Sequence, residues 1–302
     1  MASSDSARAE PGLDVGRLRL LRAVARHGSI AAGARSLGLT PSAVSQQLAV
    51  LERETGAALL SRSPRGAVLT AAGEALAVRA GDVLGLLEQA RAELDLLTGR
   101  VAGPVVVSTV ASAAATLVAA AAAAVPADVD LRVSVAEPAT SVAALLAGEA
   151  DLAVVDEYDY VPWARPELGV PVELAVEPLF AVLPDARSWP RQVALTALAD
   201  EPWVMPPDDA ACGRAVRSAC RAAGFEPRVA WETDDMWVLA TTVAAGHGVT
   251  VLPRSAIAPA PGLRVRPLAA ELARRVQLLT RPAAAGRPAV NAVRAAIIAA
   301  AG

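Results

Sequence analysis

The sequence contains no lysine, a single asparagine, two cysteines and two histidines, and aromatic residues make up only 3% of its 302 residues. Two cysteines exclude a disulfide-stabilised scaffold. Two histidines, His27 and His247, do not favour a histidine-based metal site, and we expect no metal. All 28 basic residues are arginine, and alanine is the most frequent apolar residue. This bias is typical of a GC-rich bacterial genome, so the counts of Arg and Ala carry little functional information.

The length favours two domains. Apolar residues make up 54% of the chain and charged residues 20%, which is enough to bury a core and excludes a disordered chain. The net charge of −3 is spread unevenly, because residues 1–66 hold nine arginines and five acidic residues and the remainder holds 19 arginines and 26 acidic residues. A basic N-terminal part on an acidic body suits a polyanion-binding module joined to a second domain.

The N-terminus, from Met1 to Arg8, is polar and has no apolar run before a cleavage site. We therefore expect no signal peptide and a cytoplasmic protein. Residues 104–127 carry no charge and are long enough to span a bilayer. They are mostly alanine with interspersed Ser and Thr, so we interpret them as a buried strand that runs into a buried helix, and expect no membrane association.

The first 70 residues have the order of elements of a winged helix-turn-helix. Apolar residues at helical spacing predict helices over residues 13–26 and 30–37, and a third helix that begins at Pro41 and stops at Gly56. Two short apolar runs, 59–62 and 67–70, flank a Pro/Gly turn and predict a hairpin. The sequence therefore predicts a winged helix-turn-helix domain over residues 13–70.

Small polar side chains at the start of the third helix can reach base edges in the major groove. Arginines at the tip of the hairpin can reach phosphates or the minor groove. The candidate DNA-binding residues are Ser29, Thr40, Pro41, Ser42, Ser45, Gln46, Gln47, Arg53, Arg62 and Arg65. Spacing alone leaves an alternative open, namely a small helical domain whose polar residues are simply solvated.

A long amphipathic pattern follows over residues 71–98, which we interpret as a linker helix, a dimer helix, or both. From Gly103 onward, short apolar runs alternate with helical segments, which predicts an α/β domain with a mostly parallel sheet over residues 103–302. The apolar runs lie at 105–107, 131–135, 151–155, 172–176, 179–183, 249–252 and 276–280. We expect two subdomains, I over about 103–176 and 265–302, and II over about 177–264.

The segment from Leu18 to Leu48 resembles the LysR-type transcriptional regulators, and so does the sequence that follows it. The matching motifs are Leu51-Glu-Arg-Glu-Thr-Gly56, Leu59-Leu-Ser-Arg62, Leu69-Thr-Ala-Ala-Gly-Glu74, Ala222-Ala-Gly-Phe-Glu-Pro227 and Ala244-Ala-Gly-His-Gly-Val-Thr-Val-Leu-Pro253. The resemblance covers residues 13 to about 300, and the GC-rich composition fits an actinobacterium-like source.

The resemblance implies a repressor or an activator without enzymatic activity, catalytic residues or cofactor. Its winged head binds double-stranded operator DNA, its long helix pairs two chains into a dimer or tetramer, and RNA polymerase is a partner if it activates. Many family members have a basic residue where Gln46 stands, and here the third helix has no Arg before Arg53. Base readout therefore falls to the Gln and Ser side chains and the hairpin.

In the family, a small organic effector binds between two subdomains that resemble a type 2 periplasmic binding protein. Carried over, the candidate effector-binding residues are Ser108, Thr109, Glu137, Pro207, Asp208 and His247. Free helix N-termini there favour an anionic group. A rim of acidic residues favours an amine instead, and the two alternatives stay open; the rim acids are Glu137, Asp156, Glu157, Asp159, Asp208 and Asp209. For these acids, a solvated surface is the simpler interpretation.

The two cysteines, Cys212 and Cys220, lie in the region where a peroxide-sensing branch of the family has a Cys pair. Residues eight apart on one helix are ~12 Å apart, too far for a disulfide unless the helix unfolds. We expect buried, unreactive thiols.

Two other classes of function are alternatives to DNA binding. The sequence has no phosphate-binding loop, nucleophile elbow or metal-ligand spacing, so an enzyme is not favoured. A solute-binding protein without a regulatory role would leave residues 13–70 unexplained.

Overall fold

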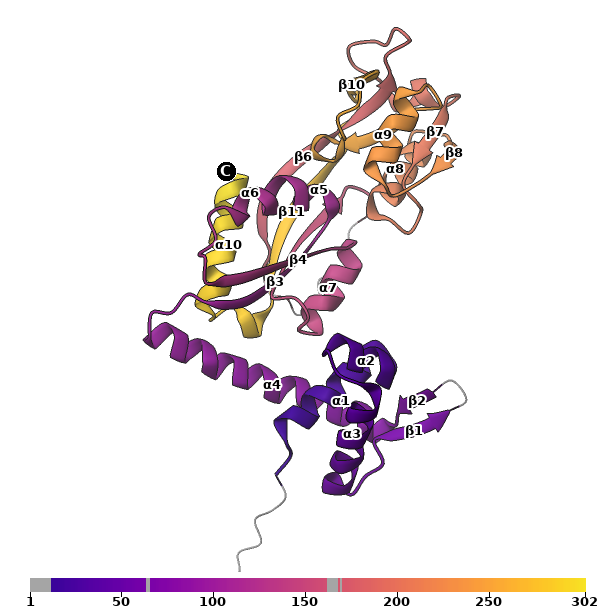
Figure 1. The fold of residues 1–302 in the computed structure, drawn as a ribbon. Coiled ribbons are helices and arrows are strands. Elements are labelled where there is room, and N and C mark those ends of the chain that lie inside the picture. Colours follow the sequence, from indigo (N-terminus) through magenta and orange to yellow (C-terminus); the bar gives the residue numbers. More distant parts are fainter. Residues whose placement is uncertain (1–11, 64–65, 162–167, 169) are drawn as a thin grey trace, which may run out of the picture. The chain divides into compact units, whose positions relative to one another are not determined.

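The computed structural model describes residues 12–63, 66–161, 168 and 170–302. The chain forms two compact units, and the division lies between Glu93 and Leu94 (Figure 1).

The N-terminal unit is a helix-turn-helix with a hairpin, as predicted. It contains α1 (Val15–His27), α2 (Ile30–Ser36), α3 (Pro41–Thr55), β1 (Leu60–Ser63) and β2 (Gly66–Leu69). The side chains of Asp14, Ser29 and Thr40 each accept a hydrogen bond from a first-turn N–H of the helix that follows, which fixes all three helix starts. Gly28 and Gly56, at φ +68° and +66°, end α1 and α3.

One apolar core joins the three helices to the hairpin. Leu21, Val24, Ala34, Val44 and Leu48 are buried in it, together with Leu51 and Leu59. The carboxylate of Glu52 on α3 accepts hydrogen bonds from the backbone N–H groups of Leu59 (2.8 Å) and Leu60 (3.0 Å). The hairpin is therefore held on α3 by both apolar packing and a charge-assisted contact.

Helix α4 spans Ala71–Leu97, the range that the amphipathic pattern predicts. Ala77, Ala80 and Leu84 are buried. Along another side of the helix, Val83, Leu86, Leu87 and Leu94 are between 39% and 64% exposed, so an apolar stripe of α4 is left uncovered in the single chain.

The C-terminal unit is an α/β domain built on a seven-stranded sheet of order β10-β6-β11-β5-β3-β4, with β9 also paired to β6. The strands of this sheet are β3 (Gly103–Thr109), β4 (Val129–Val135), β5 (Leu152–Tyr158), β6 (Val172–Pro184), β9 (Thr250–Pro253), β10 (Leu263–Pro267) and β11 (Ala273–Thr280). Strands β7 (Pro202–Met205) and β8 (Arg228–Glu232) form a separate parallel pair. The helices of the domain are α5 (Ala111–Ala113), a π-helical turn (Ala114–Val118), α6 (Ala119–Ala122), α7 (Pro138–Leu146), α8 (Ala211–Ala222), α9 (Met236–Ala244) and α10 (Pro288–Ala301), with 3-10 turns at Leu195–Leu198, Arg254–Ala256 and Pro282–Ala284.

The domain has two lobes, which can be followed in Figure 1. Lobe I has its core beneath α10 and α7, on strands β3, β5 and β11. Lobe II has its cores around α8 and α9, with the second half of β6 and strands β7 and β9. Strand β6 begins beside β11 and continues beside β9 and β10, so a single strand passes from lobe I to lobe II.

The prediction of a mostly parallel sheet is wrong. Strand β3 is parallel to β4 and β5, but β11 is antiparallel to β5 and β6, and β6 is antiparallel to β9 and β10. The reason is topological: β6 carries the chain out of lobe I and β11 carries it back, so the two run in opposite directions. The two apolar runs predicted at 172–176 and 179–183 belong to one strand, β6. Strands β7, β8 and β10 were not predicted.

Residues 104–127 form β3 and the helical segment after it, as interpreted from the sequence. Among the residues that the structure describes, no helix is both long and apolar enough to cross a bilayer.

Two glycines of α4 provide a test of the packing between the helix and the hairpin. A Cβ on Gly73 would lie 2.2 Å from the Leu59 carbonyl oxygen, whereas a Cβ on Gly81 would have its nearest neighbour, Arg22 Nε, at 3.8 Å. We expect Gly73→Ala to destabilise the protein by about 2 kcal/mol. The matched control, Gly81→Ala, should instead stabilise it by up to about 1 kcal/mol, because Ala is the better helix former. Urea denaturation of both variants measures this, and equal midpoints would contradict the placement of α4 against β1.

Candidate functional site

The exposed side of α3 near its N-terminus carries a row of small polar side chains. Val44 and Leu48 are buried in the core, while Ser42, Ser45 and Gln46 are exposed. Thr40 Oγ1 accepts the N–H of Ala43 at 3.3 Å and lies 3.2 Å from Ser42 Oγ, and Pro41 is the first residue of the helix. The helix is thus anchored by one side and presents neutral hydrogen-bonding groups on the other.

The remaining candidate DNA-binding residues have different positions. Ser29 caps α2, because its hydroxyl accepts the N–H of Ala32 at 3.2 Å. Gln47 accepts a hydrogen bond from Arg17 Nε at 3.0 Å, so its side-chain oxygen is held against α1. Arg53 is exposed. Arg62 lies in β1 opposite Ala67, and Arg65 falls outside the described residues.

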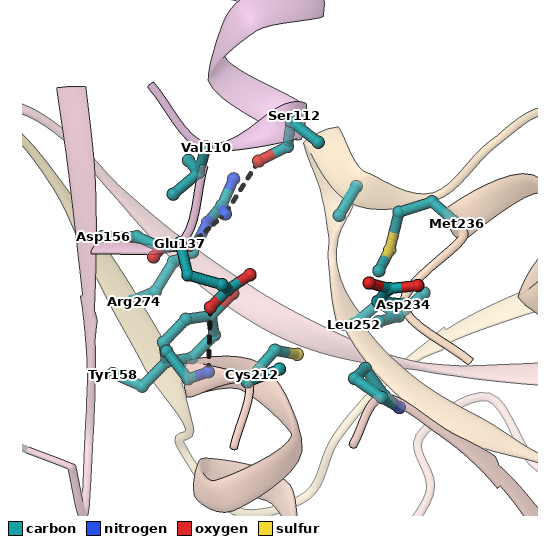
Figure 2. Close-up of a pocket in the computed structure, with 15 residues that line it drawn as sticks. Val110, Ser112, Glu137, Asp156, Tyr158, Cys212, Asp234, Met236, Leu252 and Arg274 are labelled. Carbon is teal, nitrogen blue, oxygen red and sulfur yellow. Dashed lines mark hydrogen bonds and ion pairs between the residues drawn. The ribbon is translucent and has the colours of Figure 1, made fainter. Parts of the chain in front are cut away.

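A pocket with a free volume of about 70 Å³, partly open to solvent, lies between the two lobes (Figure 2). Glu137, Tyr158 and Arg274 stand on one side, and Asp234, Met236 and Leu252 stand on the other. The lining is completed by Val110, Ala111, Ser112, Asp156, Pro206, Ala210, Ala211, Cys212 and Ala256. Both lobes contribute, so a molecule in this pocket would contact each of them.

Arg274 of β11 is 2% exposed and forms the centre of an ion-pair cluster at the back of the pocket. Nη1 donates to Asp156 Oδ2 at 2.7 Å, and Nε donates to Glu177 Oε2 at 2.9 Å. Although burial disfavours its charged form, the surrounding carboxylates raise the pKa of Arg274 above its usual range. Burial raises the pKa of Asp156, and the positive charge of Arg274 opposes that rise.

Two hydroxyl groups complete this cluster from opposite lobes. Arg274 Nη1 donates to Ser112 Oγ at 2.9 Å, and Nη2 donates to Ser255 Oγ at 2.5 Å and lies 2.8 Å from Glu177 Oε2. Ser112 belongs to α5 and Ser255 to the turn after β9. All three guanidinium nitrogens are therefore occupied by groups of the protein.

Glu137, the residue before α7, reaches across the pocket to lobe II. Its Oε2 accepts the backbone N–H of Ala211, the first residue of α8, at 3.2 Å (Figure 2). Partial burial raises the pKa of Glu137, and the N–H of Ala211 reduces this rise. Glu137 thus places a carboxylate on a helix N-terminus that an anionic ligand would otherwise use.

Of the candidate effector-binding residues, only Glu137 lines this pocket. Ser108 and Thr109 are buried within β3, where Ser108 Oγ pairs with Ser141 Oγ at 2.9 Å and Thr109 Oγ1 donates to the Val110 carbonyl at 3.3 Å. Strand β3 continues to Thr109 and the lining begins at Val110, so these two side chains lie next to the lining and not in it, and their role in effector binding stays a prediction.

Pro207, Asp208 and His247 are also absent from the lining. Pro206 lines the pocket in place of Pro207, and Asp208 is exposed in the turn before α8. His247 follows α9, and its ring packs against Trp231 with the two centroids 5.8 Å apart. The expected rim therefore lies partly outside the pocket.

Arg274, Tyr158, Asp234 and Met236 were missed as pocket residues. A signal for Arg274 is present in the sequence, since it shares strand parity with Val276 and Leu278, both 1% exposed. An arginine on the same face as buried apolar residues indicates a buried ion pair. Asp234 and Met236 follow β8, a strand that was not predicted, and no comparable signal marks them.

The cysteines are far from reactive. Cys212 lines the pocket on α8, and Cys220 is fully buried two turns later in the same helix. Burial raises the pKa of each thiol to about 12, and for Cys212 the Asp156 carboxylate adds to the effect. The two thiols remain unpaired.

Sequence profiles of two domain families match the chain. The profile described as "Bacterial regulatory helix-turn-helix protein, lysR family" matches residues 15–74, and the "LysR substrate binding domain" matches residues 98–302. The small neutral protease regulatory protein of Streptomyces coelicolor is 33% identical over 294 residues, 94% of this chain and 92% of the relative. The HTH-type transcriptional regulator ClcR of Pseudomonas putida is 30% identical over 79% of this chain and 82% of its own.

Solved structures share the fold. A full-length OxyR variant from Pseudomonas aeruginosa superposes with a TM-score of 0.72 at 22% identity, with 95% of each chain covered. Full-length CbnR in complex with its target DNA gives a TM-score of 0.54 at 22% identity, with 96% of this chain and all of CbnR covered.

The high thiol pKa values predict slow chemistry at both cysteines. At pH 8, a pKa of about 12 leaves only about one thiol in ten thousand ionised, and the thiolate is the nucleophile. We expect iodoacetamide to alkylate the folded protein at least about a hundredfold more slowly than the urea-unfolded chain, as measured by mass spectrometry. Fast alkylation of Cys212 in the folded protein, or a Cys212–Cys220 disulfide after peroxide treatment, would contradict the assignment.

Proposed function

Because the chain belongs to the LysR family of DNA-binding transcriptional regulators, we propose that it reads operator DNA with α3 and the hairpin and responds to a small organic effector held between its lobes. The family is one of regulators, not of enzymes. The observation that carries the proposal is the exposed polar row Ser42, Ser45 and Gln46 on a helix whose opposite side is locked into the core. We assign the protein to the cytoplasm, where its DNA target lies.

The boundaries that suit this role are residues 13–70 for the DNA-binding head, 71–98 for the linker helix and 103–302 for the effector domain. In the head, we assign base contacts to Ser42, Ser45 and Gln46, whose hydroxyl and amide groups can donate and accept. We assign phosphate or minor-groove contacts to Arg62 and Arg65. The DNA complex of CbnR supports the general mode of binding.

We propose that two chains associate through α4. The apolar stripe formed by Val83, Leu86, Leu87, Ala90 and Leu94 is exposed in the single chain, and burying such a surface favours association. A dimer, or a tetramer built from dimers, would place two heads on two half-sites of an operator. RNA polymerase becomes a further partner if the protein activates transcription.

The effector acts, on this proposal, by shifting the arrangement of the two lobes. The pocket draws its lining from both lobes, and the Glu137–Ala211 hydrogen bond crosses it. A ligand changes the population of an arrangement only if it binds that arrangement better than another. Contacts to both lobes provide such a difference, because they are made together only when the lobes stand at one particular separation.

The roles of α3 and the hairpin can be separated by mutation. Ser45→Ala and Gln46→Ala should change which operator bases are tolerated, each by about 1–3 kcal/mol. Arg62→Ala and Arg65→Ala should weaken binding to all sequences alike and reduce its salt dependence. Gel shifts with the protein's own upstream DNA and single-base variants measure both effects. Gln89→Ala, the same change at an exposed site of α4, is the control and should leave binding unchanged.

Two outcomes would contradict these roles. One is a change of base preference in the arginine variants while Gln46→Ala has none. The other is a loss of binding in Gln89→Ala that equals the loss in Gln46→Ala, since only the latter residue lies on α3.

The proposed association is tested by Leu87→Asp and Leu94→Asp. Either change would place an unpaired carboxylate in the apolar seam and cost roughly 2 kcal/mol or more per chain. We expect monomers by light scattering and weak operator binding, because the two half-sites are no longer engaged together. Val78→Asp is the matched control, since Val78 is 67% exposed on the opposite side of the same helix. An assembly that both leucine variants leave unchanged would place the interface elsewhere.

A further inference from the structure

The charges of the pocket between the lobes point to the chemical class of its ligand, an inference that rests on the proposed function. Three carboxylates, those of Glu137, Asp156 and Asp234, line the pocket, and Arg274 is the cation among the lining residues. Arg274 also pairs with a fourth carboxylate, Glu177. The formal charge around the pocket is therefore negative.

Arg274 is not available to an anionic ligand. A carboxylate bound by arginine needs N–H groups that point toward it. Here Nε, Nη1 and Nη2 are directed to Glu177, Asp156, Ser112 and Ser255, at distances from 2.5 to 2.9 Å. An incoming anion would have to displace a group of the protein from a residue that is 2% exposed.

The N-terminus of α8, the other feature that would attract an anion, is already occupied. Its Ala211 N–H is bonded to Glu137, so the protein supplies its own carboxylate there. The helical segment that begins after Val110 also starts at the pocket and has no side-chain cap. A helix N-terminus contributes only about half an elementary charge, which does not offset the surplus of carboxylates.

Apart from Arg274, the lining of this space includes no cation, and Arg214 on α8, outside the lining, is the positive charge that acts on Glu137. Asp234 makes no hydrogen bond or ion pair with any other residue that the structure describes, and Glu137 has the Ala211 N–H as its hydrogen-bond partner. Figure 2 shows the two carboxylates on opposite sides of the pocket, one on each lobe. Val110, Met236 and Leu252 supply apolar surface between them.

We propose that the effector is a small organic cation, an amine or guanidine with a short apolar body, held between Glu137 of lobe I and Asp234 of lobe II. Here the ammonium group of the ligand pairs with carboxylates of the protein. In a pocket with unpaired arginines, a carboxylate of the ligand would pair with those arginines instead. Within the described ranges, no three His, Cys, Asp or Glu side chains are grouped so that they could hold a metal ion, so the cation is organic. Bridging Glu137 and Asp234 gives the ligand contacts to both lobes.

Four probes with five-carbon chains test the sign of the charge: cadaverine, n-pentylamine, glutarate and valerate. Isothermal titration calorimetry on the full-length protein at neutral pH and low salt gives their dissociation constants. We expect the tighter amine to bind at least about tenfold better than the tighter acid. Glu137→Gln and Asp234→Asn should each weaken amine binding at least about tenfold. Asp200→Asn, the same change in an exposed residue of lobe II outside the lining, should have no effect.

Three results would overturn the inference: an acid that binds as tightly as the amines, amine binding that neither pocket variant weakens, or no binding of either amine. Gel shifts with the upstream DNA, run on the same samples, keep this test apart from the proposed function. If operator binding is intact while the amines fail, the assigned ligand class is wrong and the regulator assignment stands. If operator binding itself is absent, the proposed function fails whatever the pocket binds.

Discussion

Arg274 lies where the chain returns from lobe II to lobe I, and the arrangement of the effector domain depends on how its charge is satisfied. Its partners come from four separate elements: Asp156 from β5, Glu177 from β6, Ser112 from α5 and Ser255 from the turn after β9. A buried charge is tolerated only when it is paired and hydrogen-bonded. If one partner is removed, the others remain buried and uncompensated, so the cluster constrains all four elements together.

This constraint is also the basis of the proposed ligand class. The guanidinium group of Arg274 is bonded to groups of the protein, so the charges that face the open space are carboxylates. The carboxylate of Glu137 also occupies the N-terminus of α8. The same domain architecture could accept an anion if its arginine pointed into the cleft. Fold and ligand class are therefore separate properties, and the second follows from the hydrogen-bond partners of a few residues.

The sequence predicted local features well and long-range pairing poorly. Helix α4 and the ends of α3 follow from spacing, from Thr40 and Pro41 at the start, and from Gly56 at the end, because these signals act within one turn of helix. The parallel sheet was wrong because the direction of β11 is set by its pairing with β5, more than a hundred residues earlier in the chain. The lining of the pocket between the lobes begins at Val110 and not at the predicted Ser108 and Thr109, because the end of β3 depends on β4 and β5. The Arg274–Asp156 ion pair also joins residues that are far apart in the sequence. Its one signal in the sequence was that Arg274 lies on the same face of its strand as the apolar residues Val276 and Leu278.

On the proposed association of two chains, the composition of the DNA-binding head gives a physical reason for using two heads together. Helix α3 carries no arginine before Arg53, and Arg17 on α1 is already engaged by Glu54 and Gln47. Neutral side chains discriminate between bases, whereas most of the binding energy at physiological salt comes from cations near phosphates. The side chains of a single head of this kind therefore contribute more to sequence specificity than to affinity for DNA. Two linked heads gain affinity because the second half-site is met at high effective concentration. In the proposed association the exposed apolar stripe of α4 forms this link, and a pocket that alters how the chains associate would control DNA binding without any contact to the DNA.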